Sequence, residues 1–292
     1  MPIFKVIILA IVQGLAELLP VSSSAHVIVA EKLMGLDPSS PQMTLLLVML
    51  HTGTMFAVIL FFRSAWTSAY FSSREAFRRF AVLIIWATLF TGIVGEALKK
   101  IIEKTVFHGA QKAEIEQLFN HLELIAPALA AAGVVILIAG LLERRHAATA
   151  TPERTLSLMQ AGWMGAVQGL ALPFRGFSRS GSTISTGMLA GVTKKRAEDF
   201  SFAMAVVLTP AVVGLEALRL RRASHAAVAV SAAVDLKASL VLSALGAVFS
   251  FLAGLVALKW LSSWLESGRW YLFGIYCLLA SMFVYYLHAR GL

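Results

Sequence analysis

The stretch "VQGLAELLPVSSSAH", residues 12–26, decides the expected fold because it breaks an apolar segment with a proline and a cluster of polar side chains. Apolar residues 3–19 precede the break, and only a short apolar run follows it at 27–36. A membrane-spanning helix needs about 20 apolar residues. The pattern therefore predicts two half-helices joined at a polar turn, with Pro20 ending the first of them.

A second stretch has the same organisation. The apolar segment 156–174 is interrupted by "RGFSRSGST", residues 175–183, and resumes at 184–192. The pentapeptide "VQGLA" occurs at 12–16 and again at 167–171, an offset of 155 residues, and the same offset brings later apolar runs into register. We interpret this as an internal duplication, with a first repeat at 1–150 and a second at 151–292.

The composition is that of a polytopic membrane protein. Hydrophobic residues make up 58% of the 292 residues and charged residues only 14%, and the mean hydropathy is +0.78, whereas soluble domains are about 45–50% apolar. The net charge of +9 comes from basic residues clustered at the ends of apolar runs, which favours lipid headgroups over nucleic acid as partners. A single cysteine, Cys277, excludes an intrachain disulfide and is expected to pack in a helix.

Six further apolar runs are long enough to cross a bilayer, at residues 43–62, 79–98, 121–142, 199–218, 236–256 and 270–288. We expect an all-α protein with one integral membrane domain, residues 1–292, in which each half is a re-entrant helical hairpin followed by three transmembrane helices. Because each half then crosses the membrane three times, an odd number, the second half begins on the opposite side of the membrane. The two halves are therefore expected to form an inverted-topology repeat. The two polar tips then meet near the midplane, where non-helical backbone must be buried in protein or line a wet cavity.

The first tip carries the groups of an activated nucleophile. Ser23 and His26 lie one turn apart, the arrangement of a serine beside its base, and Ser22 or Ser23 is expected to cap the second half-helix. Gln13 and Glu17, spaced i, i+4, share the face that points at the tip. A capped helix start with a structural histidine is the competing interpretation, but an ionisable Glu17 at membrane depth favours a functional site.

The second tip supplies positive charge and hydroxyl groups. Arg175 and Arg179 suit bidentate contact with phosphate oxygens, Gly176 and Gly181 allow close approach of backbone to a ligand, and the half-helix at 184–192 offers free N–H groups to an anion. A basic loop at a lipid headgroup is the alternative. The predicted phosphate-binding residues are Ser22, Ser24, Arg175, Ser178, Ser180, Gly181 and Thr183.

Together the tips suit phosphoryl transfer, in which catalysis is mostly positioning and charge stabilisation. Either Ser23 or a water activated by His26 or Glu17 is the attacking group. Glu17 and Gln13 are candidate ligands for a divalent cation. The rival hypothesis is a secondary transporter for an anionic solute or lipid, since such carriers are also built from inverted repeats with broken helices. His51 lies inside an apolar run; it is expected to bond a neighbouring helix, and lining the pocket is the alternative.

At these residues the chain resembles the undecaprenyl-diphosphate phosphatase family, the bacitracin-resistance proteins of bacterial inner membranes. Gln13, Glu17 and "PVSSSAH" at 20–26 are similar to its first motif, and "RGFSRSG" at 175–181 is similar to its second. The resemblance implies hydrolysis of undecaprenyl diphosphate to the monophosphate, with Ser23 as nucleophile, His26 as base or acid, Glu17 as the catalytic or metal-binding carboxylate and Arg179 as the phosphate clamp.

The resemblance also implies a divalent cation, Mg²⁺ or Ca²⁺, a polyprenyl diphosphate lipid as substrate, and a multi-pass location in the inner membrane with the site facing the periplasm. A homodimer is a further hypothesis. Three positions depart from the family pattern. Gln13 replaces a glutamate found in many members, Ala25 replaces a glycine, and Arg175 stands in place of a proline.

Overall fold

The computed structural model describes residues 2–38, 40–105, 122–146, 155–227, 236–265 and 269–291, and this part of the chain is helical with no strand. The first half contains α1 (Ile3–Leu18), α2 (Ser23–Leu33), α3 (Pro41–Tyr70), α4 (Arg74–Thr105) and α5 (Leu122–His146). The second half contains α6 (Leu158–Ala171), α7 (Arg179–Leu189), α8 (Lys194–Ala227), α9 (Leu236–Leu265) and α10 (Tyr271–Ala289). The predicted all-α class is confirmed.

The six predicted spans are also confirmed. Among the described residues, six segments are long and apolar enough to cross a membrane: Gln42–Tyr70, Arg74–Ile102, Leu122–Arg144, Lys194–Gly214, Ser239–Lys259 and Tyr271–Ala289. Most of them extend several residues beyond an end of the predicted run, because a helix continues past its apolar middle into polar flanking turns. Residue 121 of the third predicted span lies outside the described residues, as does the predicted repeat boundary at 150 and 151.

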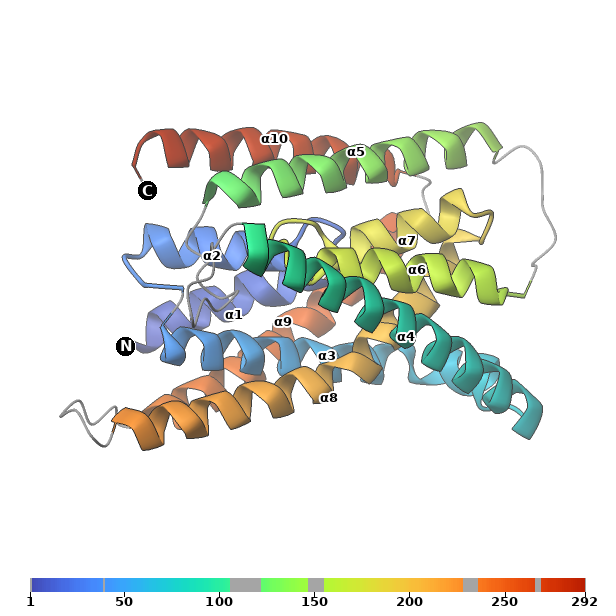
Figure 1. Cartoon of the computed structure of the whole chain (residues 1–292). Helices are drawn as coiled ribbons and strands as arrows, with labels where there is room; N and C mark the ends of the chain where they lie inside the picture. Colours follow the sequence, from blue (N-terminus) through green and yellow to red (C-terminus); the bar gives the residue numbers. More distant parts are fainter. Residues whose placement is uncertain are drawn as a thin grey trace.

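The four remaining helices form two short hairpins. Helices α1 and α2 contain 16 and 11 residues, about 24 and 17 Å at 1.5 Å per residue, which is less than the roughly 30 Å of a hydrocarbon core. Helices α6 and α7 are equally short, with 14 and 11 residues. In Figure 1 the α1–α2 hairpin enters from the left and the α6–α7 hairpin from the right, and their tips meet in the middle. The inverted relation of the two halves stays a prediction.

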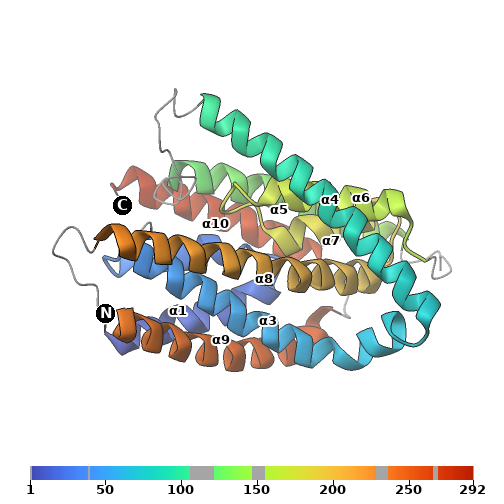
Figure 2. The same cartoon turned by 60° about the horizontal axis from the view of Figure 1, so that its bottom comes forward.

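Each hairpin is held by a long helix of the other half. Helix α1 packs along α9, and α6 packs along α4, which runs diagonally across the bundle in Figure 2. The approach is close because small residues meet. A side chain on Gly165 of α6 would start 2.1 Å from the carbonyl oxygen of Ala87 in α4. Small residues at such crossings are typical of packing between helices in membranes.

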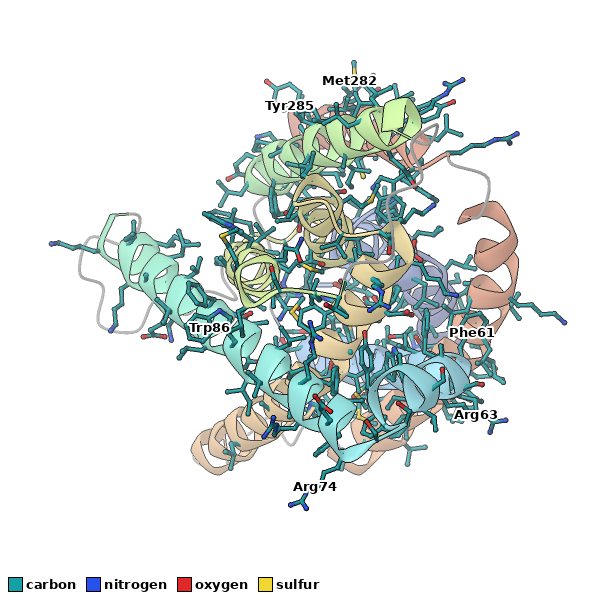
Figure 3. The ribbon with its side chains drawn as sticks, turned by 90° about the vertical axis from the view of Figure 1, so that its right-hand side faces the viewer. Phe61, Arg63, Arg74, Trp86, Met282 and Tyr285 are labelled. Atoms are coloured by element: carbon teal, nitrogen blue, oxygen red, sulfur yellow. The ribbon has the colours of Figure 1, made fainter. Side chains whose placement is uncertain are left out.

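The outer surface is apolar across the middle and basic near helix ends. Met282 and Tyr285 on α10 point away from the bundle in Figure 3 and are 68% and 63% exposed. Arg63 and Arg74 point outward near the ends of α3 and α4. An apolar surface of this kind suits lipid contact, and the chain is accordingly a multi-pass membrane protein.

Candidate active site between the hairpin tips

Glu17, in the last turn of α1, joins the two tips. Its Oε1 accepts a hydrogen bond from Nη2 of Arg179 at 2.6 Å, across 162 residues of sequence. Its Oε2 accepts from Oγ of Ser23 at 2.5 Å and from Nε2 of Gln13 at 2.8 Å. The Glu17 side chain is only 11% exposed, and a buried carboxylate surrounded by three donors is stabilised in its ionised form.

The first tip presents Ser23 through an unusual backbone turn. Helix α1 ends at Leu18, and the chain reverses before α2 begins at Ser23. Ser22, the residue before α2, has φ of 68°, and it is the only residue other than glycine with a positive φ in the described part of the chain. This left-handed conformation is unfavourable for a residue that has a Cβ atom. The predicted cap is not formed, because Ser22 makes no side-chain capping bond in this conformation.

The second tip places Arg179 at the start of α7. The helix begins five residues before the predicted position 184, since Ser178 caps it by accepting from the backbone N–H of Gly181 at 3.2 Å. Arg179 therefore lies in the first helical turn and not in a preceding loop. Its Nη2 donates to Glu17, whereas its Nη1 is buried and has no hydrogen-bond partner among the described atoms. One donor of the guanidinium thus remains available to a ligand.

A cavity of about 290 Å³ opens beside these groups, and most of the predicted site residues line it. The predicted residues in its wall are Glu17, Ser22, Ser23, Ser24, Arg175, Ser178, Arg179 and Ser180. Gly181 and Thr183 are not in the wall, and their predicted role in phosphate binding stays a prediction. Gly181 packs against Pro20 and Ile136, and Thr183 donates to the backbone oxygen of Arg179 at 2.8 Å.

The predicted pair of Ser23 and His26 is not formed. Ser23 Oγ donates to Glu17, and the imidazole of His26 faces away from the cavity. Nδ1 of His26 lies 2.8 Å from the backbone oxygen of Ser22, and Nε2 lies 2.7 Å from the hydroxyl of Tyr276 in α10. Sequence spacing placed His26 on the correct helix, but the left-handed turn at Ser22 rotates Ser23 toward Glu17 instead.

His51 of α3 lies in the cavity wall, where the sequence had favoured a structural role. Its Nε2 is 3.3 Å from Oε2 of Glu17, and its Nδ1 is 2.8 Å from the backbone oxygen of Leu47. A carbonyl oxygen only accepts, so Nδ1 is the donor in that contact, and Nε2 faces the Glu17 carboxylate. An isolated histidine in an apolar run was the only sequence signal for this contact.

The predicted cation site at Gln13 and Glu17 stays a prediction, and in this structure the two side chains contact each other. The amide of Gln13 turns its N–H toward the carboxylate, and both Glu17 oxygens already accept from protein donors. The part of the chain that the structure describes contains no group of three or more His, Cys, Asp or Glu side chains placed to hold a metal. A positive charge is supplied to Glu17 by Arg179 in this structure.

The cavity continues from the tips into an apolar groove between α3 and α8. Its walls there are Leu47, Val48, Met55 and Val58 from α3 and Phe202, Val206, Leu208, Val212 and Val213 from α8. Thr44 and Thr209 are polar residues in the same walls. The site therefore has a polar end with an arginine and serines, and an apolar extension between two membrane helices.

Comparison with known proteins agrees with this geometry. The family model described as "Bacitracin resistance protein BacA" matches residues 6–283. A protein named Undecaprenyl-diphosphatase 2 from Acinetobacter baylyi is 54% identical over 281 residues, which cover 96% of each chain. A second protein of that name, from Burkholderia ambifaria, is 32% identical over 294 residues and covers 97% of this chain and 96% of its own.

Proposed function

The chain belongs to the bacitracin resistance protein BacA family, and we infer that it is an undecaprenyl-diphosphatase. It hydrolyses undecaprenyl diphosphate to undecaprenyl phosphate and inorganic phosphate. The relatives named above are diphosphatases, which favours a hydrolase over the carrier that the repeat architecture had also allowed. Recycling of the lipid carrier for peptidoglycan synthesis, and resistance to bacitracin, follow from this activity.

One observation supports this function above the others: Ser23, Glu17 and Arg179 are linked by hydrogen bonds at the polar end of an apolar groove. A polyprenyl diphosphate has the same division, a charged head and a long apolar tail. The head fits beside the arginines and serines of the tips. The first units of the tail fit between α3 and α8.

The mechanism that we propose uses Ser23 as the nucleophile. Glu17 accepts the hydroxyl proton while Ser23 Oγ bonds to the terminal phosphorus and the bond to the bridging oxygen breaks, so undecaprenyl phosphate leaves with that electron pair. Water then attacks the phosphorus of the phosphoserine, the bond from phosphorus to the serine oxygen breaks, and Glu17 returns its proton to that oxygen, while the protons of the water leave with the phosphate as dihydrogen phosphate. Arg179 holds the charge that develops on the phosphoryl oxygens.

We propose that a divalent cation takes part in the reaction as a complex with the substrate. Glu17 is already neutralised by Arg179, so we expect Mg²⁺ or Ca²⁺ to reach the site bound to the diphosphate, with no resident protein-only site. We further propose a location in the bacterial inner membrane, with the cavity open to the periplasm. The homodimer also stays a prediction.

Phosphate release from undecaprenyl diphosphate by the purified protein in lipid nanodiscs tests the function directly. We expect release from the diphosphate and none from undecaprenyl phosphate, with a lower rate in EDTA. Ser23→Ala distinguishes attack by Ser23 from attack by an activated water, because the variant would keep much of the wild-type rate if water were the nucleophile. A folded wild-type protein that releases no phosphate from the diphosphate would refute the proposal.

His51 is expected to contribute to the rate through Glu17. His51→Leu removes the imidazole that contacts the Glu17 carboxylate and should lower kcat about 10- to 100-fold, since hydrogen bonds to charged groups contribute about 1.5–3 kcal/mol. His288→Leu is the matched control, because that histidine is exposed at the end of α10 beside Glu123. Steady-state rates of both variants test this role of His51. A His51→Leu rate within twofold of the wild-type rate would contradict a contribution of His51 through Glu17.

A further inference from the structure

Helix α10 braces the first tip from the side opposite the cavity. The hydroxyl of Tyr276 lies 2.7 Å from Nε2 of His26, and the two rings stack with centroids 5.7 Å apart and planes 11° from parallel. The next residue, Cys277, donates its thiol to the backbone oxygen of Pro20 at 3.5 Å. Two consecutive side chains of α10 thus contact the turn that carries Ser23.

The hydrogen bonds fix the proton on His26. Nδ1 of the ring faces the backbone oxygen of Ser22 at 2.8 Å, and a carbonyl oxygen only accepts, so Nδ1 is the donor. In the neutral ring Nε2 is then an acceptor, and Tyr276 supplies the hydroxyl proton that it needs. Both ring nitrogens are satisfied, so the tautomer and the ring orientation are defined together.

Ser22, whose backbone oxygen accepts the hydrogen bond from the His26 ring, is the strained residue of the tip. Ser22 has φ of 68°, a conformation that a residue with a Cβ atom adopts only where its surroundings enforce it. Its backbone oxygen accepts from the His26 ring and, at 3.3 Å, from the backbone N–H of His26. Ser23 follows immediately, so the conformation of Ser22 sets the direction of the Ser23 hydroxyl toward Glu17.

We propose that Tyr276 is a positioning residue for the reaction: it orients His26, which holds Ser22 in the left-handed conformation that presents Ser23 to Glu17. This proposal rests on the proposed function, in which Ser23 is the nucleophile. It also gives His26 a part in the reaction that needs no direct contact with the substrate. Tyr276 itself is not among the residues that line the cavity.

Tyr276→Phe removes one hydroxyl and keeps the stacked ring, so it tests the hydrogen bond alone. We expect kcat for phosphate release to fall about tenfold, because a small misplacement of a nucleophile costs rate, while KM and the thermal unfolding temperature stay near the wild-type values. Tyr285→Phe is the matched control, since Tyr285 lies on the same helix and points away from the bundle (Figure 3). This control should leave kcat unchanged.

A second comparison tests whether the effect passes through Ser22. Glycine adopts a positive φ without strain. In Ser22→Gly the backbone conformation at position 22 therefore no longer depends on the contacts of Tyr276 and His26. Ser22→Gly is expected to lower activity by itself, because Ser22 lines the cavity. Adding Tyr276→Phe to it should cost less than twofold more. An equal tenfold loss in both backgrounds would overturn the proposed route.

Nuclear magnetic resonance of ¹⁵N-histidine gives a readout that does not depend on turnover. In the wild type, the His26 signal, assigned by its loss in His26→Gln, should show a protonated Nδ1 and a hydrogen-bonded Nε2. In Tyr276→Phe the Nε2 shift should move. If Tyr276→Phe left both the spectrum and kcat unchanged, or if it raised KM, the inference would be overturned. A wild-type protein that shows the expected spectrum but releases no phosphate would count against the proposed function only.

Discussion

Glu17→Gln is expected to lower kcat for phosphate release about 1,000-fold. The substitution keeps the size of the side chain but removes the carboxylate that accepts the Ser23 hydroxyl at 2.5 Å. General bases contribute about 10²–10⁴-fold to a rate. An amide in this position has almost no basicity, so Ser23 keeps its proton and remains a poor nucleophile.

The same variant should bind its substrate at least as well as the wild type does. In the resting structure one arm of the Arg179 guanidinium is bound to Glu17 at 2.6 Å, and a phosphate group must compete with that carboxylate. With glutamine at position 17 the guanidinium no longer has a charged partner, and we expect the dissociation constant for the diphosphate to fall about tenfold, since a charge-assisted hydrogen bond contributes about 1.5–3 kcal/mol. Equilibrium binding to nanodisc-embedded protein measures this change.

Glu96→Gln provides the matched control for that experiment. Glu96 forms an exposed pair with Lys100 on α4, and its side chain is 57% exposed, so the same chemical change there should alter neither kcat nor binding. If Glu17→Gln kept more than a tenth of the wild-type rate, the role of Glu17 as proton acceptor would be wrong. If it bound the diphosphate more weakly, the competition between carboxylate and phosphate would be wrong.

The sequence predicted the fold from features that act locally or repeat. A run of about 20 apolar residues is sufficient to indicate a span, and the repeated "VQGLA" with its serine-rich breaks indicated where the two hairpins lie. The start of α7 was placed too late, because "RGFSRSGST" is polar and has little helical periodicity. The Ser178 cap, which starts the helix at Arg179, depends on local hydrogen bonds that hydropathy does not report.

The details of the site depend on contacts between residues far apart in sequence. His26 contacts the backbone oxygen of Ser22 and the hydroxyl of Tyr276, which is 250 residues away in the sequence. His51 meets Glu17 only because α3 packs against α1. Neither contact leaves a pattern in one sequence. The residue types of the site were therefore predictable, whereas the pairing of Ser23 with Glu17 required the structure.

Arg179→Ala should remove both substrate binding and transition-state stabilisation. Loss of one donor to a developing oxyanion costs about 10²–10³-fold in kcat, and the phosphate also loses its nearest cation, so KM should rise as well. Arg179→Lys keeps the charge without the forked donor, and we expect it to recover only part of the loss. Arg74→Ala, at the exposed start of α4, is the control that should keep both parameters.

Measuring the stability of Arg179 variants distinguishes two roles of this residue, neutralising Glu17 and acting on the substrate. Arg179→Ala leaves the 11%-exposed Glu17 carboxylate without its cation, and breaking a buried pair in this way costs about 3–5 kcal/mol, so the unfolding temperature should fall. Combining Arg179→Ala with Glu17→Gln removes both charges and should restore most of that stability while leaving phosphate release undetectable. Recovery of activity together with stability would show that Arg179 only neutralises Glu17 and does not act on the substrate.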